Sequence, residues 1–140
     1  MTLDRARLNT KLDEILQYYD ELLEDLPEEK AFHQDRITRR GVEKTVELIA
    51  DAIVDVSLMI ISGMGYGKPD DARSALAILQ KNKVLSSGVA AKMQDFVSFR
   101  NLLVHRYAKV DEKQEYASIQ ENHEDIPAFV KETEQFLKNG

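Results

Sequence analysis

The 140-residue chain has no cysteine, only three prolines and six glycines, and no low-complexity segment or internal repeat. Without cysteine it has no disulfide scaffold, no thiolate zinc site and no cysteine nucleophile. Because proline and glycine are scarce, few positions favour linkers, and most of the chain is expected to form long regular elements. Hydrophobic residues make up 43% of the sequence, enough for one buried core. We therefore expect one domain over residues 1–140.

The sequence also lacks a membrane-spanning run and an excess of positive charge. Its longest apolar stretch, residues 49–65, is too short and too charged to cross a bilayer, and the first residues are too charged for a signal peptide. The net charge is -6, from 19 Lys plus Arg against 25 Asp plus Glu. Generic attraction to nucleic acid or an anionic membrane is therefore unfavourable, and RNA would need a local basic site. We expect a cytoplasmic protein with no membrane partner.

Apolar residues recur three and four positions apart along most of the chain, which is the period of amphipathic helices. The first predicted helix lies between an N-cap at Thr2 and a stop at Pro27, and the second runs from about Glu28 to the glycine-rich loop GMGYGKP. Further helices are predicted over residues 71–83, over residues 87–105 with Ser86 or Ser87 as cap, and over residues 116–137. Pro127 should kink or restart the last one.

No strand-like alternation is present, so the expected fold is all-α, an antiparallel bundle of four main helices plus a shorter one. The second and last helices together offer more apolar surface than one small bundle covers, which predicts a homodimer. His123 falls on the apolar stripe of the last helix and is expected to pack in the core or at an interface.

Asp55 has apolar neighbours on nearly every side of the predicted second helix. An ionised carboxylate alone in such a setting costs several kcal/mol. Asp55 is therefore expected either to pair with a cation or to reach a gap at the surface.

One segment, FRNLLVHRY at residues 99–107, is not ordinary core or surface. Asn101 and His105 are four residues apart and share a helix face, whereas Arg100 lies in line with the apolar side of its helix and calls for an anionic partner, for which Asp55 is the first candidate. Tyr107 follows close to the expected helix end.

These side chains suit metal-free cleavage of RNA. Histidine, with a pKa of roughly 6.5, exchanges protons at neutral pH, and arginine grips a phosphate with a planar fork of donors. The spacing by itself is more often that of a capping or packing histidine at a helix end and of an arginine in a structural ion pair. Arg36, Arg39 and Arg40 form a second basic cluster that would extend an RNA track or simply be a solvated face.

The run RNLLVHRY resembles the R-N-x-x-x-H-x-Y signature of HEPN-domain proteins of the HepT type, the toxins of nucleotidyltransferase–HEPN toxin–antitoxin pairs. The resemblance covers nearly the whole chain. It implies an all-α homodimer in which two copies of the motif face each other and act as a metal-independent endoribonuclease. It also implies a partner, a minimal nucleotidyltransferase antitoxin that silences the toxin by attaching AMP to the tyrosine.

Carried over residue by residue, the resemblance makes His105 the general acid/base, Arg100 the phosphate ligand and Asn101 a positioning residue. It makes Tyr107 the modified residue and Asp55 the orienting acid. No cofactor and no metal site are expected, because no carboxylate set with ligand spacing accompanies the histidines. Two alternatives remain open: a non-catalytic helical dimer that binds a nucleotidyltransferase, and a helical nucleotide-binding protein.

Overall fold

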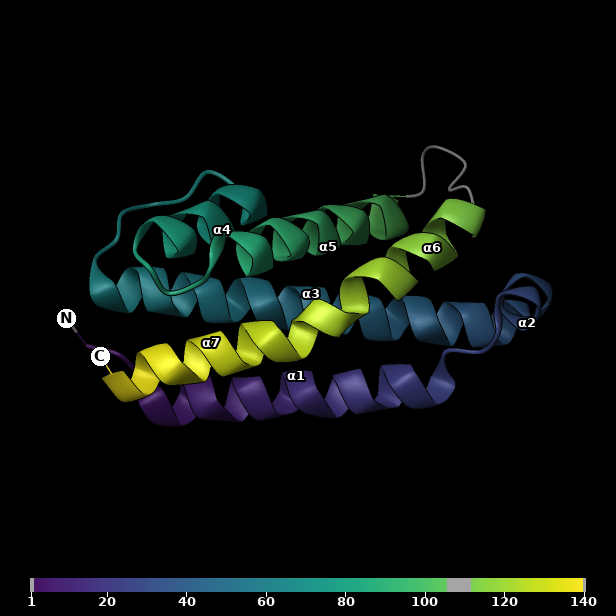
Figure 1. Cartoon of the computed structure of the whole chain (residues 1–140), viewed down its shortest axis with the longest axis horizontal. Helices are drawn as coiled ribbons and strands as arrows, with labels where there is room; N and C mark the ends of the chain where they lie inside the picture. Colours follow the sequence, from purple (N-terminus) through teal and green to yellow (C-terminus); the bar gives the residue numbers. More distant parts are fainter. Residues whose placement is uncertain (1, 106–111, 140) are drawn as a thin grey trace.

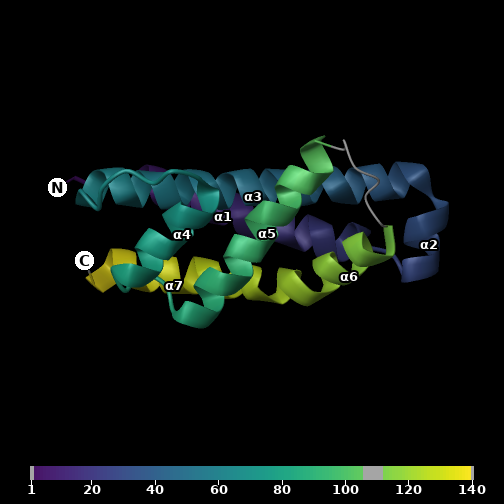
Figure 2. The same ribbon diagram turned by 90° about the horizontal axis from the view of Figure 1, so that it is seen from above.

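The computed structural model describes residues 2–105 and 112–139, which form helices packed lengthwise in a bundle (Figure 1 and Figure 2). In chain order the elements are α1 (Arg5–Asp25), α2 (Glu29–Gln34), α3 (Arg36–Met64), α4 (Ala72–Lys81), α5 (Ser87–His105), α6 (Glu112–Asn122), the 3-10 turn η1 (His123–Asp125) and α7 (Ile126–Asn139). No strand occurs in these two ranges, which confirms the all-α prediction.

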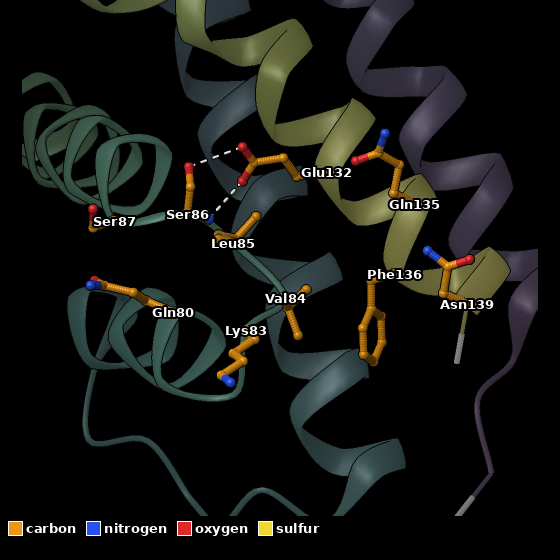
Figure 3. A pocket seen from close by; sticks show the side chains of 10 residues that line it. All are labelled: Gln80, Lys83, Val84, Leu85, Ser86, Ser87, Glu132, Gln135, Phe136 and Asn139. Atoms are coloured by element: carbon orange, nitrogen blue, oxygen red, sulfur yellow. Dashed lines mark hydrogen bonds between the residues drawn. The ribbon is translucent and has the colours of Figure 1, made fainter.

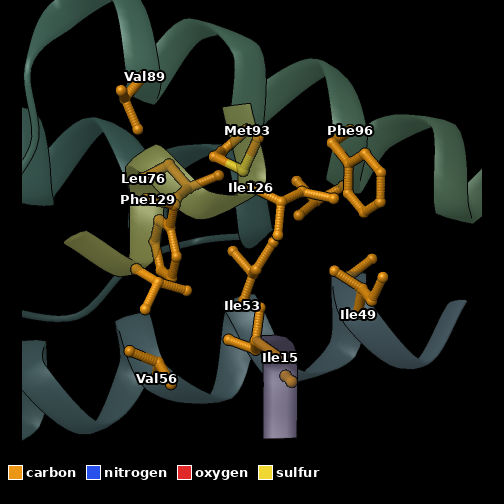
Figure 4. Close-up of a cluster of buried hydrophobic side chains, with 14 of the residues drawn as sticks. Ile15, Ile49, Ile53, Val56, Leu76, Val89, Met93, Phe96, Ile126 and Phe129 are labelled. Carbon is orange, nitrogen blue, oxygen red and sulfur yellow. The ribbon is translucent and has the colours of Figure 1, made fainter. Parts of the chain in front are cut away.

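The long helix α3 is the centre of the bundle. α1 runs antiparallel along it, and α4, α5 and α7 pack around the pair (Figure 1). Side chains from α1, α3, α4, α5 and α7 meet in one apolar core (Figure 4), and among the largest fully buried ones are Ile15, Ile49, Ile53, Leu76, Phe96 and Phe129. Each contributes roughly 1.5–3 kcal/mol of hydrophobic stabilisation. Of the helices described, none is both long and apolar enough to span a bilayer.

The predicted second helix is in fact two helices, because the helix is interrupted at Asp35. The Asp35 carboxylate accepts hydrogen bonds from the backbone N–H groups of Ile37 (3.1 Å) and Thr38 (3.2 Å) and from the Thr38 hydroxyl (2.8 Å), and so caps α3. These bonds, led by those from Thr38, lower the pKa of Asp35. Because of this interruption α2 is a separate short helix, and its residue Phe32 is fully buried. Periodicity gives only a weak signal here, because Phe32, Ile37 and Val42 are five residues apart and do not keep the spacing of one helical face.

The other helix ends largely follow the sequence signals. α1 ends before Pro27 as predicted, but the cap at Thr2 was wrong: the Asp4 carboxylate accepts the N–H of Arg7 instead. α3 ends at Gly65, which adopts the left-handed conformation with φ 70°. The predicted short helix is α4, with Asp71 as its cap.

The start of α5 is tied to α7. The Ser86 hydroxyl accepts the N–H of Val89 at 3.3 Å, which identifies Ser86 as the residue that caps α5. The Glu132 carboxylate of α7 in turn accepts from the Ser86 N–H (2.7 Å) and hydroxyl (2.9 Å), as Figure 3 shows. α5 is thus fixed at this end by side chains distant in sequence.

The last predicted helix is interrupted and restarts as expected from Pro127. α6 ends at Asn122, η1 follows, and α7 begins at Ile126, so Pro127 occupies its first turn, where no intrahelical N–H bond is lost. His123 lies in η1, is buried, and stacks at a tilt on Tyr19 with ring centroids 6.0 Å apart, which confirms its predicted packing role.

Two helical glycines give a matched test of this packing. A Cβ on Gly63 would lie 2.7 Å from both the Thr2 carbonyl oxygen and Leu3 Cδ2, whereas a Cβ on Gly41 would meet nothing within 4 Å. Gly41→Ala should stabilise the protein by about 0.5–1 kcal/mol through helix propensity. Gly63→Ala should be clearly less stable than Gly41→Ala, because the N-terminal backbone must move. Urea unfolding measures both, and equal gains would show that the N-terminal segment is not packed there.

Candidate active site

Arg100 lies where α5 crosses the middle of α3. It follows Met93 and Val97 on the side of α5 that faces the core, and both of these residues are buried. At Arg100 this side reaches the edge of the bundle, so the Arg100 side chain is 28% exposed. Its Nε lies 2.9 Å from Oδ1 of Asp51 on α3. A long side chain can cover apolar surface with its stem while its charged end reaches water, and Arg100 is placed to do so.

The pairing of Arg100 with Asp51 corrects the prediction that Asp55 is its partner. Asp55 pairs with Lys11 of α1, with Nζ and Oδ2 3.4 Å apart, and its side chain is 54% exposed. Asp55 thus both pairs with a cation and reaches the surface, the two outcomes that the sequence left open. Asp51 and Asp55 are one helical turn apart, about 6 Å along the axis, so sequence spacing could not select between them. The point at which α5 crosses α3 selects Asp51 as the partner of Arg100.

Asn101 lies beside the guanidinium and is exposed. Its Oδ1 accepts a hydrogen bond from Arg100 Nη1 at 3.3 Å. In the described part of the chain the Nε–H of Arg100 has no well-aligned acceptor, so the contact with Asp51 is a charge contact and not a directed hydrogen bond. The guanidinium is therefore held by one carboxylate and one amide, which leaves part of its planar set of donors for an anion.

The other two motif residues are less fully described. His105 is the last residue of α5, one turn after Asn101, and its side chain lies outside the described part of the structure. Tyr107 lies outside the described residues. Their predicted roles therefore stay predictions, and the helix backbone establishes only that His105 follows Asn101 on the same face of α5.

Two other features of the described residues lie apart from this motif. A cavity of about 660 Å³ between the α4–α5 connection and α7 contains Glu132, whose carboxylate is already engaged by Ser86 (Figure 3). None of the motif residues whose side chains are described lines this cavity. Within residues 2–105 and 112–139, no group of three or more His, Asp or Glu side chains could hold a metal ion.

Comparison with known proteins shows what the chain resembles. A curated relative, the tRNA nuclease HepT of Aphanizomenon flos-aquae, is 28% identical over 137 residues, which cover 93% of this chain and 89% of that protein. The cytosolic protein of unknown function YutE from Bacillus subtilis superposes with a TM-score of 0.85 at 18% identity, covering 98% of this chain and 92% of that one.

A tri-AMPylated HEPN toxin of Shewanella oneidensis, solved in complex with an MNT antitoxin, superposes with a TM-score of 0.85 at 19% identity. The match covers 91% of this chain and 96% of that one, and it establishes the same fold. The family described as ribonuclease HepT-like matches residues 12–133, most of the domain and all of the RNLLVHRY motif. The chain belongs to the ribonuclease HepT-like family.

Proposed function

We propose that this protein is the toxin of a toxin–antitoxin pair and cleaves RNA as an endoribonuclease. The observation that carries the proposal is the contact of Arg100 with Asp51, which holds the arginine of the RNLLVHRY motif, partly exposed, at the crossing of α5 and α3. Membership of a ribonuclease family supports the reaction class. The relative named as a tRNA nuclease supports transfer RNA as the substrate class.

In this proposal Arg100 binds the phosphate to be cleaved. A guanidinium offers a planar fork of donors that fits two phosphate oxygens, and it stabilises the negative charge that builds up in the transition state. Asn101 holds one edge of the fork and Asp51 holds it in place through Nε. Asp51 thus takes the orienting role first assigned to Asp55, which is engaged with Lys11 instead.

His105 transfers the protons. A base removes the proton of the 2′-hydroxyl, the 2′-oxygen attacks phosphorus, the bond from phosphorus to the 5′-oxygen breaks, and an acid protonates the leaving oxygen. The products are a 2′,3′-cyclic phosphate and a 5′-hydroxyl, with no change of oxidation state. Histidine supplies the proton transfers near neutral pH and Arg100 stabilises the charge, so the mechanism runs without a metal ion.

The reaction uses one base and one acid, and each chain supplies one His105 in its motif. We therefore propose that two copies form a homodimer in which both motifs face one cleft. Exposed apolar side chains near the motif support this arrangement. Leu58 lies two turns from Asp51 on the same side of α3 and is 41% exposed, and Leu102 on α5 is 60% exposed.

The proposed antitoxin is a minimal nucleotidyltransferase that attaches AMP to Tyr107. The AMPylated state of the Shewanella oneidensis toxin, which shares the fold, supports this form of control. The phosphodiester of an attached AMP would compete with RNA for Arg100, and the nucleotide would fill the space of the substrate. Tyr116 is the less suitable acceptor, because it is buried and its hydroxyl donates to the Pro27 carbonyl at 2.7 Å.

Replacing the histidine tests the proposed reaction. His105→Ala should lower the rate of RNA cleavage in EDTA by about 10²–10⁴, the usual contribution of a positioned acid/base, with an unchanged melting temperature. Product ends identified by mass spectrometry should carry 2′,3′-cyclic phosphate in the wild type. An unchanged rate in the variant would instead favour a non-catalytic dimer that binds a nucleotidyltransferase.

Replacing the tyrosine tests the proposed control. Tyr107→Phe should keep most of the RNA cleavage, since only a hydroxyl is lost, and should resist silencing by the nucleotidyltransferase and ATP. Intact mass after incubation should show added AMP on the wild type and on the control Tyr66→Phe, and none on Tyr107→Phe. Added AMP on Tyr107→Phe would place the modified residue elsewhere.

A further inference from the structure

Three exposed cations line the first turns of α3, away from the motif. Arg36, Arg40 and Lys44 follow one another at intervals of four residues and are called here the cationic stripe. Side chains four residues apart on a helix lie on neighbouring turns, about 6 Å apart along the axis. The stripe is thus a row of positive charges about 12 Å long.

The cationic stripe is poorly neutralised by the protein itself. In the described part of the chain, no ion pair involves Arg36 or Arg40, and Lys44 has only Glu47, with Nζ and Oε1 3.7 Å apart. The Lys44 side chain is 64% exposed, so this pair is weak. Like charges four residues apart on a helix destabilise it. The stripe is a local concentration of positive charge in a protein of net charge -6, and it suits an anionic ligand.

The cationic stripe shares a side of α3 with the candidate active site. Asp51 follows Lys44 by seven residues and Arg40 by eleven, which is about two and about three full helical turns. All three side chains therefore project from the same side of the helix. Lys44 lies about 10 Å and Arg40 about 16 Å along the axis from Asp51, the residue that Arg100 contacts. Figure 1 and Figure 2 show α3 continuing past its crossing with α5 toward α2.

We propose that the cationic stripe binds the phosphate backbone of the RNA strand that is cleaved at Arg100. This role rests on the proposed ribonuclease function. Successive phosphates of the strand lie against Arg36, Arg40 and Lys44, and the strand continues to Arg100, whose charge offsets that of Asp51. Each phosphate neutralised by a cation releases bound counterions, which gives affinity without base specificity. The stripe therefore sets how tightly RNA binds, and the motif sets how fast it is cut.

The test compares two triple variants with the same change of net charge, from -6 to -9. The first removes the stripe: Arg36→Gln, Arg40→Gln and Lys44→Gln. The control replaces three exposed cations on α4 and α7, toward the opposite end of the bundle (Figure 1), with glutamine: Lys81→Gln, Lys131→Gln and Lys138→Gln. RNA affinity of the full chain is measured by fluorescence anisotropy at several salt concentrations, together with KM and kcat.

The stripe variant should raise KM by about tenfold or more while kcat changes by less than about twofold. The slope of log affinity against log salt concentration should be smaller in magnitude by about 2 to 3. Each phosphate contact contributes about 0.7–0.9 to this slope, and the variant loses three contacts. The control should bind as the wild type does. Equal loss in both triple variants would show that only the net charge matters, and would overturn the role of the stripe.

Two further outcomes separate this inference from the proposed function. If the wild type binds RNA through the stripe but does not cleave it, the inference holds and the ribonuclease function fails. If the wild type cleaves RNA and KM is the same in the stripe variant, the function holds and the inference fails. A stripe variant that loses only its response to the nucleotidyltransferase would assign the surface to a protein partner and overturn the inference. Should the triple variant not fold, Arg36→Gln with Arg40→Gln is compared with Lys131→Gln with Lys138→Gln, since both change the net charge from -6 to -8.

Discussion

The contact between Arg100 of α5 and Asp51 of α3 is the interaction on which the proposed active site depends. The two side chains are 28% and 48% exposed, and ion pairs with this exposure contribute on the order of 0–1 kcal/mol to stability. Stability comes instead from apolar packing such as that of Phe96, which is fully buried. The ion pair therefore matters for position, since it fixes where the guanidinium lies relative to the last turn of α5 and to His105.

The two sides of α3 have different roles, one in the apolar core and one in the proposed binding of RNA. Its inner side supplies the core with residues such as Ile49 and Ile53, which are fully buried between α1, α5 and α7. Its outer side carries Asp51 and the cationic stripe. An acidic protein that binds RNA needs positive charge gathered in one place, because its overall charge repels phosphates. A single long helix can gather it, since a rigid rod places charges at fixed intervals from the site.

The helix positions could be predicted from sequence because their signals are local. The signals at Pro127 and in the glycine-rich loop after α3 act on the backbone within a few residues, and both predictions are confirmed. The break at Asp35 was missed because the large apolar residues around it, Phe32, Ile37 and Val42, are too few and too widely spaced for periodicity to separate one helix from two. For the site, the motif identified Arg100 and its neighbour Asn101, which the structure brings together.

The choice between Asp51 and Asp55 was beyond the sequence for a different reason. Both carboxylates lie on the outer side of α3 one turn apart, and the partner of each is set by where a second helix crosses. α5 crosses at Asp51 and brings Arg100 to it, whereas α1 presents Lys11 to Asp55. Crossing points follow from the packing of whole helices, so no local pattern encodes them.

The proposed role of Asp51 in positioning Arg100 is tested most directly by kcat for RNA cleavage in Asp51→Asn and Asp55→Asn. The melting temperatures of both variants are measured as well. The two variants lose the same charge one turn apart on the same helix. If Asp51 positions Arg100, Asp51→Asn lowers kcat by about tenfold to a hundredfold without a large change in melting temperature, and Asp55→Asn cleaves RNA as the wild type does. A loss of kcat in Asp55→Asn with full activity in Asp51→Asn would contradict the account.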